Sequence, residues 1–233
     1  MATFVMVPGA GSDSWYWHLV APQLEAAGHS VVAVDLPVAD DVAGLEAYRD
    51  AVLAALPGDL AGHESDLVLV AQSMGAYAAT MAADRVPVAL LVLVAPMVPA
   101  PGETPGEWWD AVGQADAARR AAVADGRDPD GELDPDETFL HDVPAAVSAE
   151  SEGHVFPQSG RPFEDAWPLD RWPEVPTRMV IGTADRLFPP ELQRRVAAER
   201  LDLVPDELDS GHLPALSRPD ELAALLLRYE RER

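Results

Sequence analysis

Ser73, in the stretch AQSMG at residues 71–75, has the surroundings that a catalytic nucleophile requires. The apolar run Leu67–Ala71 predicts a buried strand, and Ala76–Ala83 predicts a helix that follows at once. A serine on such a sharp strand-to-helix turn is held in a strained backbone conformation, so its neighbours two positions away must be small. Alanine replaces the first glycine of the usual Gly-x-Ser-x-Gly pattern. A serine that only caps the helix is the structural alternative, and these five residues do not exclude it.

A serine hydroxyl needs a base, and the base needs a carboxylate that orients it. On sheets of this kind the chain order is serine, then acid, then histidine. Asp185 follows the predicted strand Thr177–Gly182, and His212 is the one histidine after Asp185. All three residues follow strands, so we predict that they meet at one edge of the sheet, with Ser73 as nucleophile, His212 as base and Asp185 as orienting acid. Asp209 is too near His212 in sequence to be preferred as the acid.

The remaining histidines receive no catalytic role. His18 falls on a predicted helix, and His29 and His63 fall in loops at the opposite edge. His141 and His154 lie in a segment with a different composition, described below, where the position of His154 allows contact with a substrate.

The elements that must position these residues alternate along the chain. Continuous apolar strands separated by helices predict an α/β fold, a mostly parallel sheet covered by helices on both faces. The other predicted strands are 3–7, 30–35, 88–94 and 205–208, and the other helices are 15–27, 41–56, 190–200 and 219–229.

Residues 99–176 interrupt this alternation with a proline-rich, acidic stretch that holds four of the six tryptophans. The stretch lies between two strands at their carboxyl ends, so we expect it to fold over the site as a lid. It would divide the α/β core into residues 1–98 and 177–233. The tryptophans either form an apolar roof over a pocket or pack the lid onto the body, and the two roles are compatible.

The loop Pro8–Ser12 follows the first predicted strand, where open α/β sheets place ligands. Its Gly-Ala-Gly pattern lacks the third glycine of a dinucleotide-binding loop, so nucleotide binding is disfavoured. Its backbone N–H groups are instead free to meet an oxygen anion.

Residues 126–137, GRDPDGELDPDE, approach the spacing of a calcium-binding loop. Gly126 stands at the first ligand position and two prolines interrupt the run. We therefore expect an acidic, solvated loop and no metal.

Composition excludes several kinds of chemistry. The chain has no cysteine and no lysine, which excludes thiolate and Schiff-base catalysis. Its net charge of −24 argues against nucleic acid and anionic membranes as partners. No apolar stretch is long enough for a membrane span, and a strand at residues 3–7 leaves no room for a signal peptide. We expect a soluble, cytoplasmic protein without a cofactor.

The chain resembles α/β-hydrolase fold enzymes over nearly its full length, most of all the plant methylesterases, hydroxynitrile lyases and related bacterial esterases. The matching stretches are PGAGSDSWYWHLVAPQLEAAGHSVVAVDL, AQSMGAY, ADRLFPPELQR and SGHLPALSRPDEL. Pro8-Gly9 replaces the His-Gly of the family, and Ala71 opens the turn. The resemblance implies an oxyanion hole formed by the N–H groups of Ala10 and Met74.

The expected activity is hydrolysis of a small, hydrophobic carboxylic ester through an acyl-enzyme. Gly9, Trp108, Trp109 and Leu213 are expected to contact the substrate. Leu213 stands where the lyases carry a lysine, so cyanohydrin cleavage is disfavoured. Two alternatives stay open: a cofactor-free perhydrolase or acyltransferase with the same triad, and a receptor that has kept a hydrolase pocket.

Overall fold

The computed structural model describes residues 1–56, 66–131 and 134–233, and these form a six-stranded sheet in which every strand runs parallel to its neighbours. The strand order is β2-β1-β3-β4-β5-β6. This confirms the predicted fold class, and each strand begins and ends within two residues of its predicted bounds. The strands are β1 Thr3–Val7, β2 Ser30–Ala33, β3 Leu67–Gln72, β4 Leu90–Val94, β5 Thr177–Gly182 and β6 Asp206–Leu208.

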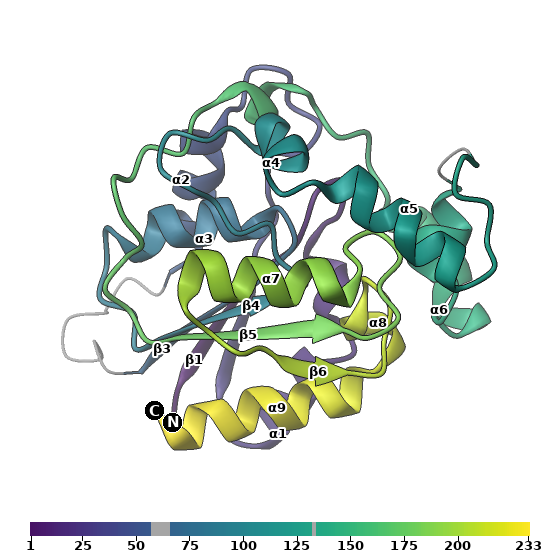
Figure 1. The fold of residues 1–233 in the computed structure, drawn as a ribbon. Helices are drawn as coiled ribbons and strands as arrows, with labels where there is room; N and C mark the ends of the chain where they lie inside the picture. The colour runs from purple at the N-terminus through teal and green to yellow at the C-terminus, as the bar shows by residue number, and fades with distance from the viewer. Residues whose placement is uncertain (57–65, 132–133) are drawn as a thin grey trace.

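Helices cover both faces of this sheet because each strand returns to the same edge before the next one starts. Alternate residues of β1 point to opposite faces: Val5 and Val7 enter one core cluster, and Phe4 and Met6 enter the other. Figure 1 shows α2, α3 and α7 on one face and α1 and α9 on the other. These helices are α1 Ala21–Ala26, α2 Leu45–Ala55, α3 Gly75–Ala83, α7 Pro190–Leu201 and α9 Pro219–Glu232, with the short α8 at Pro214–Ser217.

The predicted helix at residues 15–27 is wrong in one respect, because the chain there forms two short elements. A 3-10 turn at Ser14–Trp17 comes first, and α1 starts only at Ala21. Asp13 caps the 3-10 turn by accepting a hydrogen bond from the N–H of Trp15 at 3.0 Å. Pro22 has no N–H to donate, so it suits the first turn of a new helix better than the middle of a long one.

Helix α2 and strand β2 are also shorter than predicted. Helix α2 starts at Leu45, four residues after the predicted start. The carboxylate of Asp165 accepts from the N–H of Leu45 at 2.9 Å and so caps the N-terminus of the helix at this residue. Strand β2 stops at Ala33 and is only half-buried, since it lies at the edge of the sheet and has a neighbour on one side alone.

Residues 95–176, here called the inserted segment, leave β4 at its carboxyl end and return to the amino end of β5 (Figure 1). Its elements are α4 Pro105–Ala111, α5 Gln114–Ala124, α6 Ala145–Ser151, a π turn at Asp136–Leu140, and 3-10 turns at Glu152–His154 and Arg161–Glu164. Trp108 and Trp167 of the segment are buried in the same core as residues of the sheet. Its role as a lid stays a prediction.

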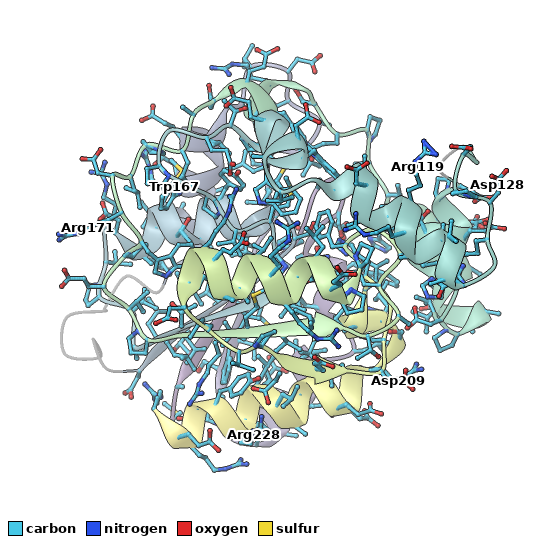
Figure 2. All side chains as sticks on the ribbon, viewed as in Figure 1. Arg119, Asp128, Trp167, Arg171, Asp209 and Arg228 are labelled. Atoms are coloured by element: carbon cyan, nitrogen blue, oxygen red, sulfur yellow. The ribbon has the colours of Figure 1, made fainter. Side chains whose placement is uncertain are left out.

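The tip of the inserted segment faces solvent. Figure 2 shows Arg119 and Asp128 at this end, and the calcium-like run lies here with residues 132–133 outside the described part. Asp128 and Asp130 are exposed, and Asp130 pairs with Arg119. Within the described ranges, no helix is long and apolar enough to cross a membrane.

Gly182, at the end of β5, gives a first testable prediction. A Cβ atom there would overlap the carbonyl oxygen of Ser210 and lie 2.5 Å from that of Gly211, in the loop that carries His212. Because backbone atoms cannot move aside, we expect Gly182→Ala to lower the free energy of unfolding by about 1–3 kcal/mol in urea titrations. The matched control is Gly160→Ala, since a Cβ at Gly160 meets nothing within 4 Å. Equal stabilities for the two variants would contradict the packing described here.

Candidate active site

Ser73 lies on the turn between β3 and α3, and its backbone has the strain that the sequence predicts. Its φ of +50° is in the left-handed region, which serine rarely adopts. Two hydrogen bonds hold it there, from Ser73 N–H to the oxygen of Val94 (3.0 Å) and from Met97 N–H to the oxygen of Ser73 (3.1 Å). A Cβ atom at Gly75 would overlap the carbonyl oxygen of Pro8, so glycine is required at that position.

His212 reaches Ser73 from the loop that follows β6. Its Nε2 atom lies 3.2 Å from Ser73 Oγ, and its Nδ1 atom lies 2.8 Å from Asp185 Oδ2. The three side chains are buried, with 8% or less of each residue exposed. Gln72 also fixes the histidine loop, because its amide donates to the carbonyl oxygen of His212 at 3.3 Å. The structure therefore brings the predicted serine, acid and histidine together.

Asp185 follows β5, and several donors satisfy its buried carboxylate. Oδ1 accepts from the backbone N–H groups of Leu187 (2.9 Å) and Phe188 (2.8 Å), and Oδ2 accepts from Gln193 Nε2 (3.1 Å) as well as from His212. These bonds replace the water that a buried carboxylate loses. Because the carboxylate only accepts, Nδ1 of His212 must carry its proton, which leaves a lone pair on Nε2 toward the serine hydroxyl.

A cavity of about 490 Å³ opens beside Ser73. Most of its lining is apolar, and Ala10 and Met74 also border it. Neither N–H of these two residues has a hydrogen-bond acceptor among the described parts of the chain, and Met74 stands at the N-terminus of α3. The apolar lining includes Trp15, Met97, Trp109, Phe139, Leu187 and Leu213.

The model of the alpha/beta hydrolase family matches residues 4–225. The chain belongs to this family. Methylesterase 7 of Arabidopsis thaliana is 30% identical over an alignment of 257 positions, which covers 96% of this chain and 94% of the relative. The named esterases among the relatives of this chain confirm the resemblance to plant methylesterases, and they support a carboxylic ester hydrolase.

Solved structures show the same fold. Polyneuridine aldehyde esterase superposes with a TM-score of 0.78 at 20% identity, covering 98% of this chain and 99% of that one. A pyrethroid hydrolase from Sphingobium faniae superposes with a TM-score of 0.75 at 23% identity, covering 99% and 97%.

The expectation that both Trp108 and Trp109 contact the substrate needs correction in this alpha/beta hydrolase, because only Trp109 of the pair is in the described lining. Trp109 lines the cavity, but Trp108 is buried in the core and donates its Nε1–H to the oxygen of Val98 at 3.0 Å. Trp167 likewise donates to Thr80 on α3, and Figure 2 shows it inside the body of the protein. Packing onto the body is thus the role of Trp108 and Trp167, and Trp15, from outside the inserted segment, is the second tryptophan at the cavity.

Gly9 and Leu213, both expected to contact the substrate, differ in their position relative to the cavity. Leu213 lines the cavity as expected, whereas Gly9 is not part of the lining. A Cβ atom at Gly9 would overlap the side chain of Gln72, so glycine lets the loop approach the turn closely. Asp209 is exposed on the outer surface beside β6, as Figure 2 shows, and does not take the place of Asp185.

Sequence reasoning missed two residues that support the site. One is Gln193, described above, and the other is Asp142 of the inserted segment, whose carboxylate accepts from the N–H of Gly211 at 2.7 Å.

Burial raises the pKa of Tyr16, the hydrogen bond from Ala215 opposes this, and the charges of Asp185 and Asp142 add to the rise. Tyr16 therefore lines the cavity as a neutral phenol.

The two adjacent tryptophans give a second testable prediction. Trp108→Phe removes a buried hydrogen-bond donor and leaves a void, so the free energy of unfolding should fall by about 1–3 kcal/mol in urea titrations. Trp109→Phe, the matched control, changes only the cavity wall and should cost well under half as much. Equal losses would mean that the two side chains do not divide between core and cavity.

Proposed function

We propose that this protein is a serine esterase in which Ser73, His212 and Asp185 form the catalytic triad. The observation that carries the proposal is the contact chain from Ser73 Oγ to His212 Nε2 (3.2 Å) and from His212 Nδ1 to Asp185 Oδ2 (2.8 Å), beside an apolar cavity. The substrate is a small, hydrophobic carboxylic ester.

Acylation starts at the serine hydroxyl. His212 Nε2 takes the proton while Ser73 Oγ bonds to the carbonyl carbon, whose oxygen becomes an anion. The N–H groups of Ala10 and Met74 bind this oxyanion, and the positive end of α3 adds to its stabilisation. A donor that acts only on the transition state contributes about 3 kcal/mol. His212 then returns the proton to the leaving alcohol as the C–O bond of the ester breaks.

Deacylation repeats these steps with water. His212 takes a proton from the water as its oxygen attacks the acyl carbon, and then gives the proton back to Ser73 Oγ as the acid leaves. Asp185 holds the imidazole in the required tautomer and stabilises the positive charge that forms twice per turnover.

The cavity favours neutral esters over charged ones. Among the described residues that line it, none is an arginine that could pair with an anion, and the chain has a net charge of −24. Bringing a carboxylate out of water into such a cavity would be costly.

A third testable prediction concerns the nucleophile. A fluorophosphonate should label the native protein at Ser73. Ser73→Ala should abolish this labelling and should lower the turnover of a short p-nitrophenyl ester by about 10⁴-fold or more. Ser12→Ala is the matched control, because Ser12 also lines the cavity and should keep both. Retained turnover in purified Ser73→Ala would refute the triad. A native protein that is not labelled would favour the receptor alternative.

A fourth prediction concerns substrate charge. Dimethyl adipate should be hydrolysed at least about tenfold more efficiently, in kcat/KM, than monomethyl adipate at neutral pH, because the second ester carries a carboxylate that the apolar lining cannot stabilise. Equal kcat/KM values would contradict the proposed preference for neutral esters.

A further inference from the structure

His154 and Asp13 form a pair at the cavity wall that none of the proposed steps uses. His154 ends the 3-10 turn Glu152–His154 of the inserted segment and lines the cavity. Its Nδ1 atom lies 2.8 Å from Oδ2 of Asp13, in the loop after β1. Both side chains are partly exposed, with 35% and 24% of their surfaces accessible, so solvent and ligands reach them.

Several contacts fix the His154 ring relative to the reacting centre. The ring stacks on Trp15 with centroids 4.6 Å apart and planes 5° from parallel. On the backbone, Val155 forms a β-bridge with Ser12, and the N–H of Phe156 donates to the oxygen of Gly11 at 2.8 Å. The loop after β1 therefore does two things: it fixes the segment that carries His154, and it presents the N–H of Ala10.

The position of the proton on His154 follows from its partner. A carboxylate can only accept, so the neutral imidazole carries its proton on Nδ1 and donates it to Asp13. Nε2 then has a lone pair, and no group in the described residues donates to it. The hydroxyl of Ser151, also at the cavity, is already engaged, because it donates to the oxygen of Ser148 at 2.7 Å.

We propose that His154 is a specificity-determining residue whose Nε2 accepts a hydrogen bond from a hydroxyl group of the substrate, away from the scissile ester. This rests on the proposed esterase function and narrows its substrate class to neutral esters that carry a hydroxyl or another uncharged donor. In a mostly apolar cavity, a fixed acceptor at the wall favours a ligand that carries a donor at the matching position.

Asp13 makes the proposal sharply testable because its two oxygens have different partners. Oδ1 accepts from the N–H of Trp15 at 3.0 Å, and Oδ2 faces His154 Nδ1. In Asp13→Asn the amide oxygen must stay with Trp15, so the NH2 group faces Nδ1 and donates to it. The imidazole proton then moves to Nε2, and the acceptor at the cavity becomes a donor.

The experiment compares two series of esters at mildly alkaline pH, where an imidazole is uncharged. The probes are methyl ω-hydroxyalkanoates and the methyl ω-methoxyalkanoates of matched chain length, so that increasing length scans the position of the hydroxyl. For each variant the readout is the ratio of kcat/KM between the two series.

The baseline is His154→Phe, which keeps an aromatic ring against Trp15 but has no nitrogen. At the best chain length the native protein should prefer the hydroxy ester by about tenfold relative to this baseline, as one uncharged hydrogen bond gives. Asp13→Asn should lower the ratio to about the baseline, because a donor at Nε2 can bond the oxygen of the hydroxyl group and that of the methoxy group alike. His18→Phe is the matched control and should leave the ratio unchanged, because His18 stacks on Trp15 at 4.1 Å but does not line the cavity.

The outcomes separate this proposal from the esterase function. Hydrolysis of both series with the same ratio in the native protein and His154→Phe overturns the role of His154 and leaves the esterase standing. Hydrolysis of neither series, nor of p-nitrophenyl esters, by the native protein overturns the esterase itself. If thermal unfolding shows that Asp13→Asn does not fold, the native protein and His154→Phe decide the matter alone.

Discussion

The hydrogen bond between Asp185 and His212 is the interaction on which the site depends. A carboxylate with none of its side-chain surface exposed needs strong donors, and it has four, from two backbone N–H groups, a glutamine and the imidazole. The N–H groups of Leu187 and Phe188 fix the carboxylate independently of the histidine. The imidazole therefore has one orientation and one tautomer available. That tautomer leaves the lone pair on Nε2 that accepts the proton of Ser73 in the proposed mechanism.

The parallel sheet makes this arrangement possible. Ser73, Asp185 and His212 lie far apart along the chain, yet β3, β5 and β6 end at the same edge of the sheet. Close approach of the loops then sets the distances, which is why glycines at 75 and 182 face backbone oxygens of neighbouring loops. The inserted segment completes the site from above, where Asp142 bonds the loop of His212 and Trp109 lines the cavity.

Much of this was predictable from the sequence, because the informative signals were local. The strand-turn-helix context identified Ser73, and the order of residues after strands identified Asp185 and His212. Trp108 and Trp109 mark the limit of such reasoning. Adjacent residues on α4 point about 100° apart, so one enters the core and the other the cavity, and no local signal says which.

Contacts between polar residues of separate elements could not be predicted from the sequence, because no local pattern marks them. Gln193 and Asp142 are ordinary polar residues until the fold places them against Asp185 and Gly211. The pair of Asp13 and His154 spans 141 positions, and the turn that Asp13 caps was itself predicted as part of a longer helix. Gln193 lies on α7 and the other contacts lie in irregular segments, and in neither case does periodicity indicate which polar residues will meet.

The most direct test of the account is a crystal structure of the protein after reaction with diethyl p-nitrophenyl phosphate, whose tetrahedral adduct resembles the acylation intermediate. The account predicts a bond from phosphorus to Ser73 Oγ, with the phosphoryl oxygen within hydrogen-bond distance of the N–H groups of both Ala10 and Met74. An adduct on another residue, or a phosphoryl oxygen that points away from both N–H groups, would contradict it.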